Sequence, residues 1–247
     1  MSEITVAEAK REGKVLATNG ILNDPSRAGQ LAYQNVPDDK DTGQKPLSLT
    51  LMYIPQAATA LGELFVAGYE KMLAPSFGYT IADLTYADVL QGRGDQETLS
   101  LGHSRGVIVQ KNAFDIAASN GYVNKNLSVQ SLGGGVEFED LTNAAVRITT
   151  EDGRKNITYT YMANDPVPVI AAGSPGDALA AMLEFSNVLA TNNSAHSCYG
   201  TGASGCSTIA NPVPGGPVPT NQNQALIRVY RGGELASPSS SISGRLP

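Results

Sequence analysis

Residues 97–121, ETLSLGHSRGVIVQKNAFDIAASNG, decide the fold of this chain. Residues 97–101 predict a short strand, and the residues after the turn that follows predict a helix that runs to about Asn120 and is capped by Gly121. Between the two stands GHSRG (102–106), which fits the pattern G-x-S-x-G. The pattern alone is common, but a strand before it and a helix after it are the context that its chemistry requires.

Ser104 is the candidate nucleophile in this turn. A serine at so sharp a strand-to-helix turn has a strained backbone, and its hydroxyl projects above the sheet. Gly102 and Gly106, two positions to either side, allow the strand and the helix to approach closely. The Arg105 N–H, at the start of the helix, would point to where an oxyanion forms. The alternative is a serine in an ordinary strand-to-helix turn.

Strands and helices alternate along the rest of the chain, which predicts an α/β fold with a mostly parallel sheet and helices on both faces. The further predicted strands are 47–55, 127–134 and 156–162, and the further predicted helices are 1–18, 26–36, 59–73, 80–91 and 176–190. Asp152-Gly153, between VRITT (146–150) and the strand 156–162, predicts a local antiparallel hairpin. We expect an N-terminal extension (1–18), one α/β-hydrolase-like domain (19–210), and a Pro/Gly-rich linker and tail (211–247).

The composition argues against several classes of function. Seventeen Lys and Arg against 23 Asp and Glu give a net charge of −6 without a basic stripe, so nucleic acid is not expected as a partner. Two histidines and two cysteines fit no zinc spacing, and we expect neither a metal nor a cofactor. The N-terminus lacks the apolar core of a signal peptide, and no run of about 18 apolar residues predicts a transmembrane segment.

A nucleophilic serine needs a base, and the base needs an acid that orients it. In α/β-hydrolases these residues follow the serine in the order Asp or Glu, then His. His196 is the only histidine after Ser104 and is the candidate base, with a surface loop histidine as the alternative. His103 directly precedes the serine, so we expect its side chain to point away from the hydroxyl and to have a structural role.

Asp165 is the candidate acid, because it follows an apolar strand and precedes a proline that fixes an extended turn. The alternative is a plain Asx-turn before that proline. Asp177 is the second choice, although its surroundings resemble a helix N-terminus, where aspartate is favoured as a cap. Asp140 is only the third choice, because it lies too close to the loop of the preceding strand.

The second oxyanion donor is expected in the loop after the strand 47–55. Pro55 has no N–H, so Gln56 or Ala57 would supply it. Cys198 and Cys206 lie eight residues apart beside His196 and form a candidate disulfide that would help to hold the base. Such a bond implies an oxidising compartment, and two free thiols in a cytosolic protein are the equally weighted alternative.

GHSRG with its following helix and HSCYG (196–200) are the most specific pieces of a wider pattern, which also includes NGILND (19–24), GELFVAGYEKML (62–73) and NDPVPVI (164–170). Over about residues 19–205 the pattern resembles the C-terminal region of filamentous haemagglutinin-type exoproteins, which belong to two-partner secretion and contact-dependent inhibition systems of Gram-negative bacteria. The resemblance implies a lipase- or esterase-like α/β-hydrolase region within or just before a toxin portion, with Ser104 as nucleophile and His196 as base. It also implies a secreted or cell-surface parent chain that is delivered into a target cell.

The leading hypothesis is therefore a serine hydrolase that cleaves a carboxylic ester and acts as an antibacterial effector. The expected partners are an ester or lipid substrate, the surface of a membrane, and an immunity protein. The second hypothesis is a carrier or binding module before a toxin, with weak or no turnover, because a fold alone does not establish activity.

Overall fold

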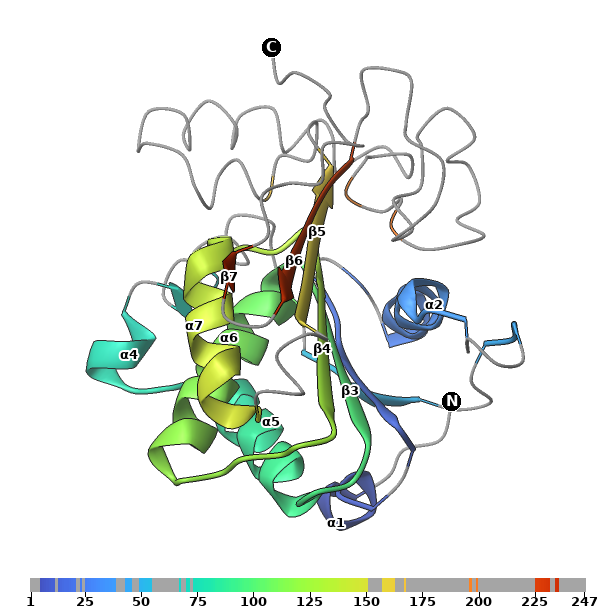
Figure 1. Cartoon of the computed structure of the whole chain (residues 1–247). Coiled ribbons are helices and arrows are strands. Elements are labelled where there is room, and N and C mark those ends of the chain that lie inside the picture. Colours follow the sequence, from blue (N-terminus) through green and yellow to red (C-terminus); the bar gives the residue numbers. More distant parts are fainter. Residues whose placement is uncertain are drawn as a thin grey trace.

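The computed structural model describes residues 5–11, 13–20, 23, 25–38, 43–45, 49–54, 67, 70–71, 73–150, 157–162, 167, 196, 199, 225–231 and 234–235. These residues form an α/β fold in which one sheet has helices on both faces (Figure 1). The strands are β1 (Val15–Thr18), β2 (Thr50–Met52), β3 (Thr98–His103), β4 (Leu127–Leu132), β5 (Ile157–Met162), β6 (Ala225–Arg231) and β7 (Glu234–Leu235). The helices are α1 (Val6–Ala9), α2 (Pro25–Asn35), α4 (Ala74–Phe77), α5 (Ile81–Gly92), α6 (Arg105–Ser119) and α7 (Phe138–Ile148).

The sheet has the strand order β2-β1-β3-β4-β5-β6-β7. The first five strands in this order are mutually parallel, and β6 and β7 add to the edge in antiparallel orientation. In the register of the central strands, Thr18 of β1 lies opposite Gly102 of β3, and His103 lies opposite Leu132 of β4. The carboxyl ends of β1, β3 and β4 therefore meet at one edge of the sheet, where α/β proteins place their sites.

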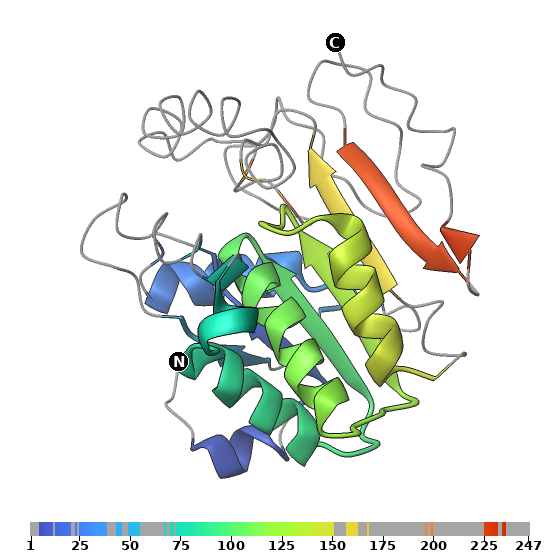
Figure 2. The same cartoon turned by 90° about the vertical axis from the view of Figure 1, so that its left-hand side faces the viewer.

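Two layers of helices cover the sheet. Helices α5, α6 and α7 lie side by side over one face, and α2 lies over the other (Figures 1 and 2). Side chains alternate between the faces along each strand. On β1, Leu16 belongs to the core on the side of α5–α7, whereas Val15 and Ala17 belong to the core under α2.

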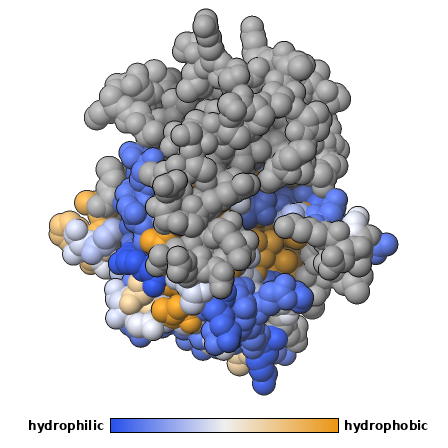
Figure 3. Space-filling view, viewed as in Figure 1, coloured by the Kyte–Doolittle hydropathy of each residue, from blue (hydrophilic) through white to orange (hydrophobic). Residues whose placement is uncertain are grey.

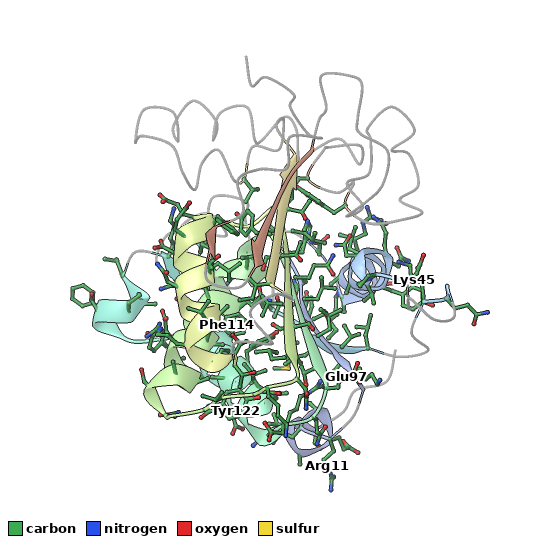
Figure 4. All side chains as sticks on the ribbon, in the orientation of Figure 1. Arg11, Lys45, Glu97, Phe114 and Tyr122 are labelled. Carbon is green, nitrogen blue, oxygen red and sulfur yellow. The ribbon has the colours of Figure 1, made fainter. Side chains whose placement is uncertain are left out.

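The central strands are buried on both faces, as expected for a parallel sheet. All four residues of β1 are buried, and so are five of the six residues of β3. Phe114 of α6 is fully buried in the core between the helices and the sheet (Figure 4). At the opposite end of α6 from Ser104, the hydroxyl of Tyr122 donates a hydrogen bond to the carbonyl of Gly94 at 3.0 Å (Figure 4).

Several sequence-based predictions are confirmed by these elements. The α/β fold, the mostly parallel sheet and the helices on both faces are present. The predicted helices 26–36 and 80–91 correspond to α2 and α5, and the predicted strands 47–55 and 127–134 contain β2 and β4. Gly121 follows α6 with a φ of 73°, the left-handed conformation of a glycine that terminates a helix.

Two predictions were wrong. Among the described residues, the helix expected over residues 1–18 is limited to α1, and residues 15–18 form β1, an inner strand of the sheet. The hairpin expected at Asp152-Gly153 lacks its first arm, because residues 146–148 are the end of α7. The β-branched residues in VRITT suggested a strand, but the buried positions Phe138, Leu141, Ala145 and Ile148 repeat with the period of a helix.

Large apolar side chains are exposed in α4 and at the start of α5. Phe77 of α4 is 78% exposed and Ile81 of α5 is 82% exposed. Figure 3 shows hydrophobic residues gathered at the left edge of the molecule, where Figure 1 places α4. Within the described part of the chain, no helix has the length and apolar character needed to cross a bilayer.

Substitutions at positions 141 and 143 test the helical assignment of α7. In a helix these two side chains point in different directions, whereas in a strand they would share a face. Leu141 is fully buried and Asn143 is exposed. We expect Leu141→Ala to lower the free energy of unfolding by about 2–5 kcal/mol and Asn143→Ala to change it by less than about 0.5 kcal/mol, measured by urea denaturation. Comparable losses in both variants would contradict the helix.

Candidate functional site

Ser104 has the most unusual backbone conformation of the described residues. Its φ is 58° and its ψ is −126°, and it is the only described residue other than glycine with a positive φ. This region of φ and ψ is adopted freely only by glycine, and another residue there costs about 1–3 kcal/mol. Such strain persists only where the surrounding structure enforces it, and it is concentrated at functional sites.

Close packing of the backbone enforces the turn. A Cβ atom at Gly106 would lie 2.5 Å from Oγ1 of Thr18 and 2.8 Å from the carbonyl oxygen of Asn19. A Cβ atom at Gly102 would lie 2.5 Å from Oε1 of Gln110 in α6. Both glycines of GHSRG are therefore needed for close approach, as the sequence predicted.

Hydrogen bonds hold the peptide groups of Ser104 on both sides of the turn. Its N–H donates to the carbonyl of Leu132 at the end of β4, at 3.0 Å. Its carbonyl accepts from the N–H of Val107 at 3.0 Å and from the N–H of Gly135 at 3.3 Å. The strained residue is thus tied to β4, to the first turn of α6 and to the glycine-rich loop after β4.

The hydroxyl of Ser104 has no structural task among the described residues. Ser104 is 1% exposed, and its Oγ is buried without a hydrogen-bond partner. A buried hydroxyl without a partner is uncommon, because it loses its hydrogen bonds to water and gains nothing in return. An unpartnered hydroxyl on a strained backbone is the state expected of a group kept for chemistry rather than for stability.

His196 lies against the residue that precedes the serine. The imidazole rings of His196 and His103 are stacked, with centroids 4.7 Å apart and an angle of 25° between the planes. Nε2 of His103 lies 2.9 Å from the carbonyl oxygen of His196. Because a carbonyl only accepts, His103 must donate this hydrogen bond. The structure thus brings the candidate base, 92 positions after Ser104 in the sequence, to the end of β3.

No hydrogen bond joins the candidate base to the candidate nucleophile in this structure, since Oγ of Ser104 has no partner. Catalytic hydrogen bonds are often long in unliganded enzymes and shorten when substrate binds. His196 is buried, so the alternative of a surface loop histidine does not apply. His103 is also buried and hydrogen-bonded, which agrees with the structural role predicted for it.

Arg105 forms a buried ion pair that the sequence did not predict. Its guanidinium forms a bidentate ion pair with Glu70, with Nε to Oε2 and a terminal nitrogen to Oε1 both at 2.7 Å. Glu70 is fully buried, and its backbone carbonyl accepts a hydrogen bond from Asn112 of α6 at 3.0 Å. The pair fixes the residue after Ser104, so the first peptide of α6 has a defined direction. In the sequence, Glu70 and Lys71 stand out only as adjacent charged residues in GELFVAGYEKML, and nothing there predicts that Glu70 pairs with Arg105.

Asp83 joins the same buried polar group. Its carboxylate accepts hydrogen bonds from the N–H and the hydroxyl of Thr80, both at 2.8 Å, in a capping box at the start of α5. Asn112 also donates to it at 3.3 Å. Burial, together with the negative charge of Glu70, raises the pKa of Asp83 to about 6, although the hydrogen bonds from Thr80 and Asn112 act in the opposite direction.

The end of β1 packs directly on the serine. A Cβ atom at Gly20 would lie 2.7 Å from Cβ of Ser104 and 3.2 Å from its Oγ. The side chain of Asn19 shapes this segment, since it accepts from the N–H of Ile54 at 2.6 Å and donates to the carbonyl of Ile54 at 3.1 Å. Asn19 and Gly20 are part of NGILND, but the sequence predicted the second oxyanion donor after the next strand instead.

The remaining predicted site residues lie outside the described residues, with one exception. Those outside are Asp165, Asp177, Gln56, Ala57, Cys198 and Cys206. The acid, the second oxyanion donor and the disulfide therefore stay predictions. The exception is Asp140, which is exposed in the first turn of α7 and has the position of a helix-terminal carboxylate.

A small cavity lies between the end of β1, helix α2 and His103. Its volume is about 10 Å³, and Asn35 of α2 lines it with a buried amide oxygen that has no hydrogen-bond partner among the described residues. This space holds about one water molecule, so it is not a pocket for an acyl chain. The residues described in the structure contain no group of three or more side chains able to hold a metal ion.

Comparisons with protein-family models, with curated proteins and with solved structures give no match for this chain. The fold and the site residues described above therefore stand on the chain's own geometry.

Glycine at position 104 tests the strain of the turn. Ser104→Gly and Ser104→Ala both remove the unpartnered hydroxyl, but only glycine also relieves the backbone strain at a φ of 58°. We expect Ser104→Gly to be more stable than Ser104→Ala by about 1–2 kcal/mol in urea denaturation. Equal stability of the two variants would show that the turn is not strained.

Asp83→Asn tests the buried carboxyl group through pH. The pKa of Asp83 is about 6 in the folded protein and near 3.8 in the unfolded chain, so the unfolded chain loses its proton first as the pH rises. The free energy of unfolding should therefore fall between pH 4 and pH 6, and the wild type should lose about 2–3 kcal/mol relative to Asp83→Asn over this interval.

The matched control for this measurement is Gln91→Ala, which changes a side chain without an ionisable group on the same helix. Its difference from the wild type should stay nearly constant over the same interval. A pH-independent difference between the wild type and Asp83→Asn would contradict the raised pKa.

Proposed function

We propose that this protein is a serine hydrolase that cleaves a carboxylic ester, with Ser104 as nucleophile and His196 as general base. The observation that carries the proposal is Ser104 itself, which combines a glycine-like backbone conformation with a buried hydroxyl that has no partner. This is the geometry of a nucleophile turn between a strand and a helix. A serine with a structural role would instead relax its backbone or share its hydroxyl.

In the proposed mechanism, Oγ of Ser104 attacks the carbonyl carbon of the ester as His196 takes its proton. His196 then gives that proton to the leaving alcohol. Water next attacks the acyl carbon as His196 takes its proton, and His196 returns that proton to Oγ of Ser104 as the carboxylic acid leaves. The contact of His196 with His103, the neighbour of Ser104, supports its assignment as the base.

Asp165 is proposed as the acid that orients His196. It follows the last residue of β5 by three positions, and β5 runs parallel to β3 with one strand between them. The carboxyl ends of parallel strands meet at the same edge of a sheet, so Asp165 follows a strand that ends on the same edge as the strand before Ser104. The chain order Ser104, Asp165, His196 is also the one that a triad of this class requires.

The oxyanion would be bound by two backbone N–H groups. The first is that of Arg105, which as the first residue of α6 has no acceptor within the helix. For the second, the contact of Gly20 with Ser104 favours the segment that begins at Gly20. Gln56 stays the alternative, because Ile54, two positions before it, is hydrogen-bonded to Asn19 at the end of β1.

The resemblance to exoprotein regions supports a lipid or another ester as substrate and a secreted toxin as the setting. In that setting we propose an antibacterial effector that acts on a target cell and is held inactive by an immunity protein in the producer. A disulfide between Cys198 and Cys206 would fit the oxidising compartment that export implies.

The experiment that tests the proposed function is covalent labelling with a fluorophosphonate, in parallel with hydrolysis of p-nitrophenyl esters and phospholipid vesicles. We expect labelling and turnover in the wild type, and losses of about 10⁴-fold or more in kcat for Ser104→Ala and His196→Ala. Asp165→Asn should lower kcat by a similar factor, because it leaves the wrong tautomer of the base.

The matched control is Ser119→Ala, which removes an exposed hydroxyl at the far end of α6. It should keep full labelling and turnover. Because Ser104 is 1% exposed, slow labelling that a lipid surface or a small organic cosolvent accelerates would also agree with the proposal. A folded wild type that neither reacts nor turns over any of these esters would favour the carrier module.

A further inference from the structure

We infer that His103 is a positioning residue for the general base, and this inference rests on the proposed function. Nε2 of His103 donates a hydrogen bond to the backbone carbonyl of His196, and the imidazole rings of the two residues are stacked. One side chain of the nucleophile motif thus fixes the backbone of the residue that must remove the serine proton, and its ring packs on the ring of that residue.

The rigidity of His103 makes it suited to this task. It is the last residue of β3, pairs with Leu132 of β4 in the middle of the sheet, and is buried. Side chains alternate along a strand, so His103 shares the α2 face with Leu101, whereas Gly102 faces α6. The ring of His103 therefore projects from a fixed strand to the side of the sheet where His196 lies.

The hydrogen bond also fixes the proton on His103. Because the carbonyl of His196 can only accept, Nε2 of His103 must carry a hydrogen, and the neutral ring is the Nε2–H tautomer. The hydrogen bond from His103 to the backbone carbonyl of His196 holds the backbone there and does not involve the ring nitrogens of His196.

Tyr199 and Gln34 complete the attachment of this segment. The ring of Tyr199 packs edge-on against both imidazoles, at centroid distances of 5.8 Å from His103 and 6.5 Å from His196. The amide of Gln34 in α2 donates to the carbonyl of Tyr199 at 2.6 Å. The backbone carbonyls of His196 and Tyr199 are thus held by donors from β3 and α2, and the aromatic ring of Tyr199 completes the cluster.

Three variants of the full chain separate the hydrogen bond from the packing. His103→Gln keeps a donor at a similar reach, His103→Phe keeps a ring without the donor, and Tyr122→Phe changes a hydroxyl at the far end of α6 as the control. Ester kinetics should show kcat lowered about tenfold or more in His103→Phe with KM within about twofold, because a misplaced base slows the chemistry without weakening binding. His103→Gln should recover kcat to within about threefold, and Tyr122→Phe should match the wild type.

A second measurement does not depend on turnover. The chain has only two histidines, so ¹⁵N-labelled imidazole resonances can be assigned by removing one residue at a time. In Ser104→Ala at pH 8, His103 should be the Nε2–H tautomer, and His103→Phe, which lacks the donor, should shift the His196 resonances more than His103→Gln does.

The outcomes separate this inference from the proposed function. A wild type without labelling or turnover overturns both. A wild type that reacts, together with full kcat in His103→Phe or an Nδ1–H tautomer of His103, overturns only the positioning role. Equal losses of kcat in His103→Gln and His103→Phe would also overturn it, since the donor would then not be what matters.

Discussion

The backbone of Ser104, held at a φ of 58°, is the constraint on which the rest of the site depends. A serine leaves this conformation unless its neighbours prevent it, because the strain costs about 1–3 kcal/mol. Here the hydrogen bonds of its peptide groups to Leu132, Val107 and Gly135 hold it in place. Glycines at 20, 102 and 106 provide the space, since side chains at these positions would collide with Ser104 or with the atoms around the turn.

Around this turn, buried polar side chains fix the segments that surround the serine. Glu70 holds Arg105 on one side, the side chain of Asn19 links the ends of β1 and β2 on another, and His103 reaches His196 on the third. A buried ion pair such as that of Glu70 and Arg105 contributes little net stability, because both charges lose their hydration. Its effect is to give the first turn of α6 one orientation, which matters if the Arg105 N–H binds an oxyanion.

The sequence predicted the strand–turn–helix around Ser104 because three independent signals agree there: apolar periodicity, glycines at fixed positions, and Gly121 as a helix end. It failed where local propensity and periodicity conflicted. Asp152-Gly153 after VRITT suggested a hairpin, yet Ile148 is buried on the face of α7 that also carries Leu141. It failed again at residues 15–18, because VLAT is too short to be distinguished from the end of a helix, and only its pairing with β2 and β3 makes it a strand.

For the site, the sequence identified single residues but not the contacts between them. Ser104 and His196 were predicted from a motif and a chain order. The pairing of His196 with His103, the ion pair of Arg105 with Glu70, and the approach of Gly20 to Ser104 all join residues far apart in the chain. Such contacts depend on the strand order, and the order β2-β1-β3-β4-β5 cannot be predicted from any local sequence pattern.

The most direct test of the central claim, that Ser104 is an activated nucleophile, is to locate a fluorophosphonate adduct by tandem mass spectrometry. Trypsin cleavage after Arg93 and Arg105 releases residues 94–105, GDQETLSLGHSR, which contain both Ser104 and the buried Ser100 of β3. The account predicts one adduct, on Ser104, that forms when the native protein reacts and does not form when the protein is denatured before the probe is added. An adduct on another residue, or equal reaction of native and denatured protein, would contradict it.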